Sequence, residues 1–420
     1  MDKFVIKGGK KLKGTVEVSG AKNASLALMP ACLLTDGVST LSNTPELNDV
    51  YTMIKLLTFL GSEISFENHQ LKIDTKKIST FEAPYEHVKK MRASVYVLGP
   101  LLSHYGNAKV SLPGGCAWGP RPINLHLEAL EKMGAEIELD SGYIMAKAKR
   151  LNGAKINFDI SSVGATGNIL MAASLAKGTT IINNAAMEPE ITNLAEFLVR
   201  MGAKINGIGT SSLEIEGVEN LSAVEIETIP DRIEAGTLLI ASAITGGNIT
   251  LNNIQSKYIQ AVISKLEDSG CSIKIKENSI NISHTGDIKS VNVSTSIFPG
   301  YPTDMQAQWI AYMSISNGVA AVTDTIYIDR FKHVPELIRL GANITVSENS
   351  AIVRGVNQLD GAKVMSTDLR ASASLVLAGL AAKGTTEVLR VYHLDRGYQR
   401  IEEKLKSLGA NIERVPGAEF

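Results

Sequence analysis

The 420-residue sequence is 44% apolar and 20% charged, which is typical of a globular protein, and its length exceeds one comfortable hydrophobic core, so we expect two domains. Its 42 basic and 43 acidic side chains give a net charge of -1, which argues against nucleic acid or a membrane surface as a partner. Residues 1–14 lack the apolar segment of a secretory signal, and no apolar run is long enough for a membrane span, so we expect a cytoplasmic protein without membrane insertion.

A Gly-x-x-Ile pattern recurs along the chain and marks the first class of predicted helix. The glycines are separated by 73, 68, 68, 71 and 68 residues, at Gly61, Gly134, Gly202, Gly270, Gly341 and Gly409. An amphipathic helical stretch precedes each glycine, as at residues 193–202 and 400–409, and a short alternating strand follows. Glycine in this position is typical of a left-handed helix end. Six copies at near-constant spacing predict an internal repeat.

A second helix precedes the amphipathic one in most copies, and its end is also marked by glycine. These stretches are apolar on nearly every side, as at residues 167–176 and 237–244, which predicts helices buried all round. Each repeat therefore predicts a strand, a buried helix, a strand, an amphipathic helix and a strand. In the second copy we expect the glycine- and proline-rich segment 114–122, which contains Cys116, to stand where the buried helix should begin.

Polar residues gather where strands pass into predicted helices. They include Lys22, Asn23, Arg121, Asp231, Arg232, Asp304, Asp368 and Arg370. Serine, threonine and aspartate at such positions are commonly simple N-caps. Lysine and arginine are disfavoured there because the helix N-terminus carries partial positive charge. If the repeats are pseudo-symmetric, these ends converge, and the cations predict an anionic ligand.

Cysteine and histidine usage argues against a metal or a disulfide framework. Cys32, Cys116 and Cys271 are odd in number and widely spaced, and no CxxC pair occurs. The seven histidines show no HxxxH or HExxH spacing. We therefore expect no metal and no cofactor, with Cys32 and Cys271 acting as packing residues in a reducing compartment.

Motifs spread over the whole chain resemble the UDP-N-acetylglucosamine 1-carboxyvinyltransferase family, within the EPSP synthase-like enolpyruvyl transferases. They are SGAKNA at 19–24, PGGCAWGPRP at 113–122, SVGAT at 162–166, PTDMQAQ at 302–308, RFKHVPEL at 330–337, TDLRASASL at 367–375 and DRGYQRIEEKL at 395–405. The resemblance implies an α/β fold, a two-domain inside-out α/β barrel of six βαβαββ repeats, three per domain, with buried helices. One lobe would comprise 1–21 plus 230–420, with Asp304, Arg370 and Arg396. The other, 22–229, would contain the Cys116 loop, and the active site would lie in the cleft between the domains.

The implied reaction transfers the enolpyruvyl group of phosphoenolpyruvate to the 3′-hydroxyl of UDP-N-acetylglucosamine and releases phosphate through a tetrahedral ketal. This is the first committed step of peptidoglycan synthesis in the cell wall. By resemblance, Cys116 is the general acid and the residue that the inhibitor fosfomycin alkylates. Asp304 resembles the residue that accepts the hydroxyl proton. We expect its position at a helix start to keep it ionised and only weakly basic.

The resemblance also implies two sets of ligand-binding residues. Those for phosphoenolpyruvate are Lys22, Asn23, Arg121, Arg370 and Arg396, with Lys22 and Arg396 also catalytic and with Arg330 and Asp368 in supporting roles. Those for UDP-N-acetylglucosamine are Asn23, Arg92, Arg121, Pro122, Ile123, Asn124, Leu125, Ser162, Val163, Gly164, Asp304 and Ile326. Two residues depart from the family pattern: Ile160 stands where some members have a lysine near the diphosphate, and Asn48 replaces a basic residue.

Two alternative functions remain open. A 3-phosphoshikimate 1-carboxyvinyltransferase would share the fold and the chemistry, although the Cys116 loop and the PTDMQAQ motif argue against it. A non-catalytic, UDP-sugar-binding regulatory homologue is a rival of another class, and the retained Cys116, Lys22, Asp304 and Arg396 argue against it. A cysteine-based redox sensor is less favoured because no resolving thiol is evident.

Overall fold

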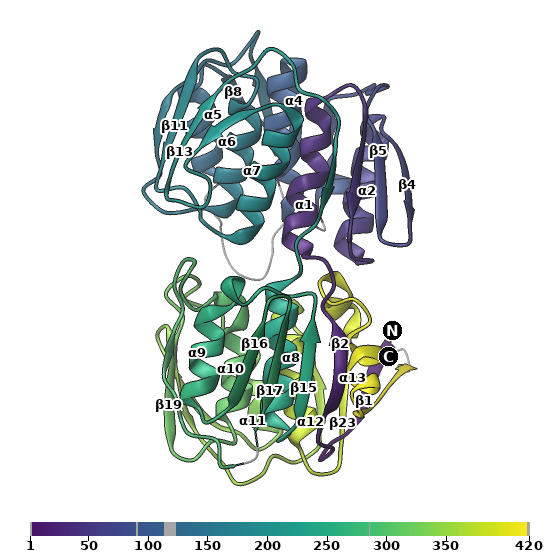
Figure 1. The fold of residues 1–420 in the computed structure, drawn as a ribbon, viewed down its shortest axis with the longest axis vertical. Coiled ribbons are helices and arrows are strands. Elements are labelled where there is room, and N and C mark those ends of the chain that lie inside the picture. The colour runs from purple at the N-terminus through teal and green to yellow at the C-terminus, as the bar shows by residue number, and fades with distance from the viewer. Residues whose placement is uncertain (1, 90, 113–122, 285, 418–420) are drawn as a thin grey trace. The chain divides into compact units, whose positions relative to one another are not determined.

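The computed structural model describes residues 2–89, 91–112, 123–284 and 286–417. The chain forms two compact units, the first built from Met1–Ser19 with Pro230–Phe420 and the second from Gly20–Ile229 (Figure 1). Backbone hydrogen bonds follow this division, because Asp231 N–H donates to Ser19 O over 2.8 Å in the first unit and Ala21 N–H to Ile229 O over 2.7 Å in the second. Gly20 and Ala21 thus belong to the second unit, whereas we expected the first lobe to extend to residue 21.

The second unit contains three related copies of a helix–strand–helix–strand–strand motif. The first copy comprises α1 (Lys22–Ala31), β3 (Val38–Ser42), α2 (Asn48–Leu60), β4 (Glu63–Glu67) and β5 (Gln70–Asp74). The second comprises β6 (Glu82–Ala83), α3 (Tyr85–Val88), the 3-10 helix η2 (Arg92–Val97), α4 (Leu98–Tyr105), β7 (Asn107–Ser111), α5 (Asn124–Lys132), β8 (Glu136–Asp140) and β9 (Tyr143–Lys147). The third comprises β10 (Lys155–Asn157), α6 (Val163–Ala173), β11 (Thr179–Asn183), α7 (Pro189–Met201), β12 (Lys204–Asn206) and β13 (Ser212–Glu216), followed by β14 (Glu225–Glu227).

The first unit repeats this arrangement. It begins with β1 (Asp2–Lys7) and β2 (Lys13–Glu17), and its first copy continues with α8 (Arg232–Ile244), β15 (Asn248–Asn252), η3 (Ser256–Tyr258), α9 (Gln260–Asp268), β16 (Ser272–Lys276) and β17 (Ser279–Ser283). The next copy comprises β18 (Val293–Ser294), η4 (Thr303–Met305), α10 (Gln306–Met313), β19 (Val319–Thr323), α11 (Val334–Arg339), β20 (Asn343–Ser347) and β21 (Ser350–Arg354). The last comprises β22 (Lys363–Met365), α12 (Leu369–Ala381), β23 (Thr385–Leu389), η5 (Val391–Arg396), α13 (Ile401–Ser407) and β24 (Asn411–Pro416).

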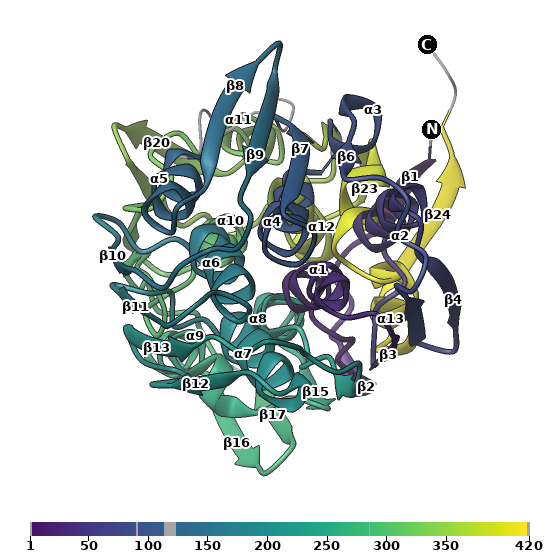
Figure 2. The ribbon, with the colours of Figure 1, turned by 90° about the horizontal axis from the view of Figure 1, so that it is seen from above.

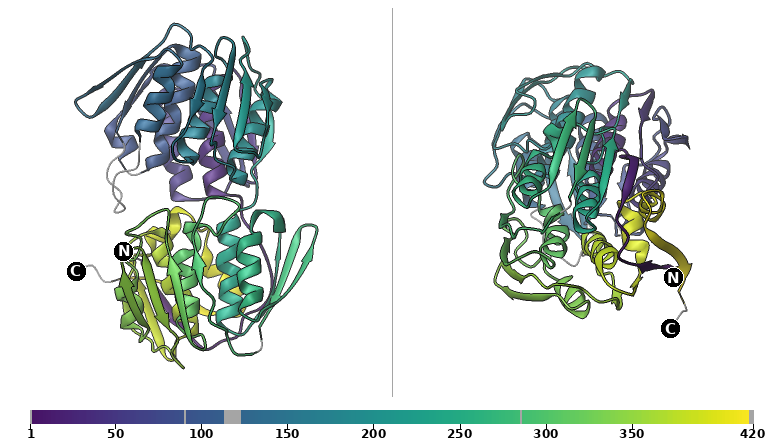
Figure 3. Two further views of the ribbon diagram at one scale, coloured as in Figure 1. Left: turned by 90° about the vertical axis from the view of Figure 1, so that its left-hand side faces the viewer. Right: turned by 60° about the horizontal axis from the view of Figure 1, so that its bottom comes forward.

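The described strands form six four-stranded sheets with a shared topology. In each, one edge strand runs parallel to its neighbour and the other pairs are antiparallel. For example, β10 pairs Lys155 with Ile181 in parallel, and β13 pairs Ile215 with Thr180 in antiparallel. Alternate residues such as Ile182 and Leu213 are buried, so each sheet turns one apolar face inward. Helices α1, α4 and α6 lie inward of the strands in the second unit (Figure 2), and the strands of the first unit likewise flank its helices (Figure 3).

Two strands are exchanged between the halves of the chain. Strand β2 directly precedes α1 but pairs with β15, so it belongs to the first unit. Strand β14 directly precedes α8 but pairs with β3 in the second unit. Strand β1 lies between β23 and β24, with Phe4 and Ile6 fully buried. The first unit therefore depends on residues from both ends of the chain.

The helix classes read from the sequence are confirmed. Every residue of α8 from Ile233 to Ile244 is buried, as is every residue of α12 from Leu369 to Leu380. The six repeat glycines have φ between 92° and 114°, the left-handed conformation that glycine adopts without strain. No helix in the described part of the chain is long and apolar enough to cross a membrane.

Our prediction for the second copy is wrong in one respect. Its buried helix is α4, introduced by η2 at Arg92, and the segment 113–122 falls in the chain between β7 and the amphipathic α5. Gly99 and Pro100 obscured the helical pattern in the sequence. Packing requires the glycine, because Gly99 N–H donates to Asn168 Oδ1 over 2.7 Å and an added Cβ would lie 2.4 Å from that oxygen. The polar start of this buried helix is therefore Arg92 rather than Arg121.

Candidate functional site

Several polar residues at helix starts are N-caps, the alternative that the sequence left open. Asp231 Oδ1 accepts from the backbone N–H groups of Ile233 and Glu234 at the start of α8. Asp368 Oδ1 accepts in the same way at α12, and Ser162 Oγ accepts from Ala165 N–H at α6. These side chains satisfy N–H groups that have no partner within the helix. The cations at helix starts need a different explanation.

In the second unit, Lys22 begins α1 and forms an ion pair. Its Nζ lies 2.8 Å from Asp49 Oδ2, and the two side chains are 12% and 5% exposed. Asp49 occupies the first turn of α2, where a carboxylate also complements the partial positive charge of the helix end. The pair thus holds the ammonium group at a fixed place while leaving part of it accessible. Asn23, the next residue of α1, is exposed.

A buried histidine lies beside the start of α6. Asn168 Nδ2 lies 3.0 Å from His126 Nδ1, so the amide donates and the neutral ring carries its proton on Nε2. The same amide group donates to Val95 O over 2.9 Å. Burial lowers the pKa of His126 to about 4, so the ring is neutral near pH 7. A Cβ added to Gly164 would lie 3.2 Å from Nε2, which places this polar edge at the first turn of α6.

Most of the described residues implied for UDP-sugar binding lie on packed elements of the second unit, whereas Asp304 and Ile326 belong to the first. Arg92 begins η2, which contacts α1, and Ser162–Gly164 begin α6, which contacts α5. Ile123 precedes α5, Asn124 is exposed at its start and Leu125 is buried. The two departures also lie here: Ile160 is 65% exposed, and Asn48 is an exposed first residue of α2.

In the first unit, Asp304 lies between two guanidinium groups. Its Oδ1 is 2.8 Å from Arg330 Nη2 and its Oδ2 is 2.9 Å from Arg370 Nη2. Arg370 comes from α12 and Arg330 precedes α11, while Asp304 lies in η4 immediately before α10. Asp304 is 27% exposed, whereas the two arginines are 10% and 4% exposed. The carboxylate is therefore the accessible member of the cluster.

The two arginines determine the charge state of Asp304. Burial by itself would raise the pKa of this carboxyl group, but the charges of Arg370 and then Arg330 outweigh that effect and hold the pKa well below its usual range. Asp304 is thus ionised near neutral pH and a weak base. We expected this charge state from its place at a helix start, but the two arginines are its cause. Such a group can accept a hydrogen bond from a hydroxyl and orient it.

Arg370 has a hydrogen-bond donor that the described part of the protein does not use. Its Nη1 is buried and has no hydrogen-bond partner among the described residues, while its guanidinium lies 5.4 Å from the ring centroid of Tyr398. Tyr398 is itself held by Thr237, whose Oγ1 is 2.9 Å from the phenolic oxygen. The arginine is thus fixed by packing on one side and by Asp304 on the other.

Arg396 ends η5 and is partly buried. The neighbouring acidic residue, Asp395, forms hydrogen bonds with a different arginine. Asp395 accepts two hydrogen bonds from Arg414 of β24, over 2.5 and 3.0 Å. Arg414 also donates to Glu402 of α13 over 2.6 Å. This clamp fixes η5 and with it the position of Arg396.

Three of the predicted site residues, Cys116, Arg121 and Pro122, lie outside the described residues. The other two cysteines are buried, as predicted for packing residues, and burial raises the thiol pKa of Cys32 to about 12. No group of three or more histidine, cysteine, aspartate or glutamate side chains in the described ranges could hold a metal ion.

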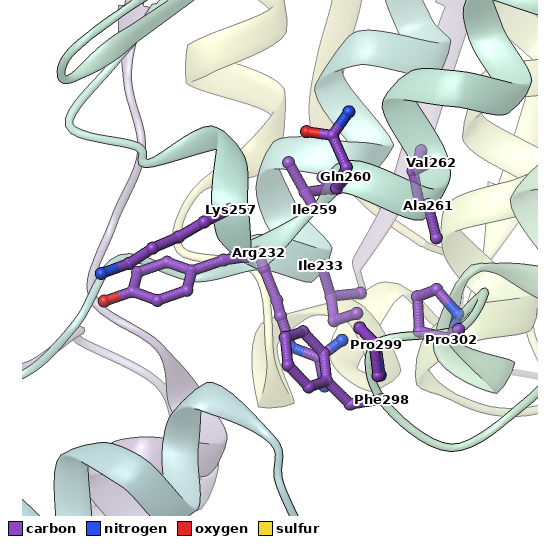
Figure 4. A pocket seen from close by; sticks show the side chains of 12 residues that line it. Arg232, Ile233, Lys257, Ile259, Gln260, Ala261, Val262, Phe298, Pro299 and Pro302 are labelled. Atoms are coloured by element: carbon purple, nitrogen blue, oxygen red, sulfur yellow. The ribbon is translucent and has the colours of Figure 1, made fainter. Parts of the chain in front are cut away.

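A small pocket lies at the start of α8, but it contains none of the predicted ligand-binding residues (Figure 4). Its wall includes Arg232, Ile259 and Phe298, and the Arg232 guanidinium lies 5.7 Å from the Phe298 ring centroid. The arginine at this helix start therefore packs against an aromatic ring within a wall of mostly apolar side chains.

Sequence reasoning missed the partners that hold these groups. Asp49, His126 and Asn168 each act through contacts distant in the sequence, and no local pattern distinguishes them from ordinary helix residues. For Asp49 the one available signal was a carboxylate in a predicted first helical turn.

Comparisons with known proteins find relatives that match nearly the whole chain. Residues 6–405 match the family model described as EPSP synthase (3-phosphoshikimate 1-carboxyvinyltransferase). A UDP-N-acetylglucosamine 1-carboxyvinyltransferase of Chloroherpeton thalassium is 59% identical over 100% of this chain and 99% of its own. One of Geotalea daltonii is 54% identical over 99% and 100% of the two chains.

Solved structures confirm the predicted inside-out α/β fold. The enolpyruvyl transferase NikO from Streptomyces tendae matches with a TM-score of 0.89 at 23% identity over 99% of both chains. The EPSP synthase from Acinetobacter baumannii matches with a TM-score of 0.75 at 19% identity over 99% of this chain and 100% of its own. The chain therefore belongs to the EPSP synthase family and, within it, to the UDP-N-acetylglucosamine 1-carboxyvinyltransferases.

Proposed function

We propose that the protein transfers the enolpyruvyl group of phosphoenolpyruvate to the 3′-hydroxyl of UDP-N-acetylglucosamine and releases phosphate, the first committed step of peptidoglycan synthesis. The observation that carries this proposal is the full-length similarity to proteins named UDP-N-acetylglucosamine 1-carboxyvinyltransferase. The relative from Chloroherpeton thalassium is 59% identical. The small-molecule substrates and the transferase class follow from the same similarity. A cytoplasmic location fits nucleotide-sugar chemistry and remains part of the proposal.

The proposed reaction has an addition and an elimination step. In addition, the sugar hydroxyl oxygen bonds to C2 of phosphoenolpyruvate, the hydroxyl proton leaves, and another proton reaches the methylene carbon to give a methyl ketal. In elimination, the methyl group loses a proton as phosphate departs, which restores the double bond. The enzyme must therefore supply an acid, an acceptor for the hydroxyl proton and cations for the oxyanions.

We assign the hydroxyl acceptor to Asp304. Its contacts with Arg330 and Arg370 support an orienting role more than full deprotonation, because they make the carboxylate a weak base. An oriented hydroxyl needs to lose its proton only as the new carbon–oxygen bond forms. Arg370, with a buried Nη1 donor that has no partner among the described residues, is proposed as a ligand for an anionic group of phosphoenolpyruvate.

The remaining anion ligands are proposed as Lys22, Asn23, Arg121 and Arg396. The ion pair of Lys22 with Asp49 and the clamp on η5 support this, since both fix a cation before substrate binds. For the UDP-sugar we propose Asn23, Arg92, residues 121–125, Ser162–Gly164, Asp304 and Ile326. Ile326 is 37% exposed and follows β19, while Ile160 offers no charge to the diphosphate.

Cys116 is proposed as the general acid and as the site of fosfomycin alkylation. An ordinary thiol has a pKa of about 8.5 and is mostly protonated at neutral pH, so it can deliver a proton to the methylene carbon. The proposal requires Cys116, Lys22 and Asp304 to act on one pair of substrates.

The test compares Cys116→Ala with Cys116→Asp. We expect Cys116→Ala to lose phosphate release near pH 7, because no acid remains. Cys116→Asp should keep activity and escape fosfomycin, because a carboxyl group can donate a proton but offers no thiolate. Phosphate release at the wild-type rate by Cys116→Ala would refute the acid role, and fosfomycin inactivation of Cys116→Asp would refute the alkylation site.

A further inference from the structure

Asp324 is a fully buried carboxylate to which the proposed function gives no role. It follows β19 and accepts four hydrogen bonds. Its Oδ1 accepts from Thr295 Oγ1 over 2.8 Å and from the backbone N–H groups of Ile326 and Tyr327 over 3.0 and 2.9 Å. Its Oδ2 accepts from Thr303 Oγ1 over 2.7 Å. All four groups donate to the carboxyl group, so both of its oxygens are held in place.

The hydroxyl of Thr303 links Asp324 to the arginine that holds Asp304. Its single proton is used toward Asp324, so its lone pairs face Arg330 Nη1, which donates over 2.9 Å. The other terminal nitrogen of Arg330, Nη2, lies 2.8 Å from Asp304 Oδ1. A continuous series of polar contacts thus runs from Asp324 through Thr303 and Arg330 to Asp304.

Asp324 also shapes the segment that contains Arg330. By accepting from Ile326 and Tyr327 N–H it fixes the turn that leads from β19 toward Arg330. Thr325 strengthens the same turn, since its Oγ1 donates to Thr295 O over 2.6 Å. Both the backbone of the arginine segment and one edge of the guanidinium therefore depend on one buried carboxylate.

The charges explain why such a support matters. Asp304 faces two guanidinium groups, and Asp324 adds a second carboxylate to the cluster through Thr303. Arg330 directs Nη1 toward Thr303 and Nη2 toward Asp304. If the contact with Thr303 were lost, Nη1 could also turn toward Asp304, and a bidentate pair would take up one more of the roughly four lone-pair sites of the carboxylate, which leaves fewer for a substrate hydroxyl.

We propose that Asp324 is a positioning residue for the transfer reaction, acting through Thr303 to fix the Arg330 guanidinium so that Asp304 stays available to the substrate hydroxyl. This inference rests on the proposed function. It adds two residues, Asp324 and Thr303, that do not touch the reacting atoms. Thr303 lies within the PTDMQAQ motif, but the sequence predicted no role for either residue.

The first test uses Thr303→Val, which removes the hydroxyl at nearly constant volume. We expect kcat for phosphate release to fall by roughly 10- to 100-fold, the size expected when a catalytic group is misplaced by less than an ångström. The KM values for both substrates should stay within about 3-fold, because the lost interaction operates only as the hydroxyl reacts. Thr303→Ser restores the hydroxyl and should recover most of the wild-type kcat.

A matched control is Thr323→Val, which removes the hydroxyl directly before Asp324. That hydroxyl lies 2.8 Å from Ser350 Oγ and takes no part in the hydrogen bonds that link Asp324 to Asp304. It should leave kcat unchanged. If Thr303→Val retains wild-type kcat, or if Thr303→Ser and Thr323→Val are as impaired as Thr303→Val, the proposal is wrong.

The second test is a double-mutant cycle with Asp324→Asn, which keeps an acceptor for the backbone N–H groups but removes the charge. If Asp324 acts through Thr303, the double variant should lose little more kcat than the worse single variant. Fully additive losses of kcat would show that Asp324 does not act through Thr303 and would overturn the proposal. Wild-type turnover in the same assay separates the two proposals, because its absence would refute the function, whereas normal turnover with an unaffected Thr303→Val would refute the positioning role alone.

Discussion

At the scale of single residues, the protein uses buried charge to hold a few polar groups in fixed places. Asp304 keeps its charge near neutral pH because Arg370 and Arg330 outweigh the effect of burial on its pKa. Lys22 is similarly held by Asp49, which is 5% exposed. In both cases removal of the carboxylate, Asp304 or Asp49, would take the acidic partner from a largely buried cation, which is far more costly than the net gain from the pair.

His126 gives a pH prediction at this scale. Its pKa is about 4 in the folded protein, because of burial, and about 6.5 in an unfolded chain. As pH falls from about 6.5 to 4, the unfolded state binds a proton that the folded state does not, so the free energy of unfolding falls. We expect this group to remove on the order of 2–3 kcal/mol by pH 4.

The measurement is urea unfolding of wild type and His126→Asn between pH 4 and 7. Asparagine keeps an acceptor for Asn168 but does not titrate, so its unfolding free energy should decrease less over this interval. Parallel curves for the two proteins would contradict the assignment. His333, buried with a pKa of about 3, contributes equally to both proteins.

The charged residues of the candidate site could be identified from the sequence, whereas the residues that contact them could not. Lys22, Asp304 and Arg370 stood out because their charges sit at predicted helix starts. Asp49 and Asp324 look like ordinary polar residues, since their roles depend on contacts between elements distant in the sequence. Resemblance supplied the roles of Arg92 and Arg396, and no physical pattern alone would have done so.

At the scale of elements, helix starts serve structure and function together. Asp368 caps α12 by accepting from Arg370 and Ala371 N–H over 2.9 and 3.1 Å, which also fixes the backbone from which Arg370 reaches Asp304. The sequence predicted these starts and the glycine ends because local chemistry governs both. It failed at α4, where Gly99 is set by contact with Asn168.

The cap gives the element-scale prediction. Asp368→Ala should lower the free energy of unfolding by about 1 kcal/mol, because two N–H groups lose their acceptor. Asp368→Asn retains an acceptor oxygen and should change stability by less than half as much. Thermal or denaturant unfolding would measure both variants, and equal losses would show that the charge, rather than the cap, is what Asp368 contributes.

At the scale of the whole molecule, the repeats form two units that differ in where their strands come from in the sequence. The second unit is built from the continuous segment Gly20–Ile229. The first needs β1 between β23 and β24, and β2 beside β15. Six repeats were countable from the sequence, but spacing alone did not reveal which strand completes which sheet; the family resemblance implied that the first strand joins the C-terminal half.

This difference predicts how fragments behave. Residues 20–229 alone should unfold cooperatively, since their sheets are complete. Residues 230–420 alone should not, because two sheets lose a strand and the burial of Phe4 and Ile6, each worth roughly 1.5–3 kcal/mol, is lost. Adding a peptide of residues 1–19 should restore a cooperative circular-dichroism transition. A cooperative transition of 230–420 without the peptide would contradict the strand assignment.

The substrate hydroxyl that receives the enolpyruvyl group distinguishes this enzyme from a 3-phosphoshikimate 1-carboxyvinyltransferase, and a phosphate-release assay with each candidate substrate measures the difference. With phosphoenolpyruvate present, UDP-N-acetylglucosamine should give one phosphate for each enolpyruvyl ether detected by mass spectrometry, and shikimate 3-phosphate should give none. Release with shikimate 3-phosphate and none with UDP-N-acetylglucosamine would refute the proposed function.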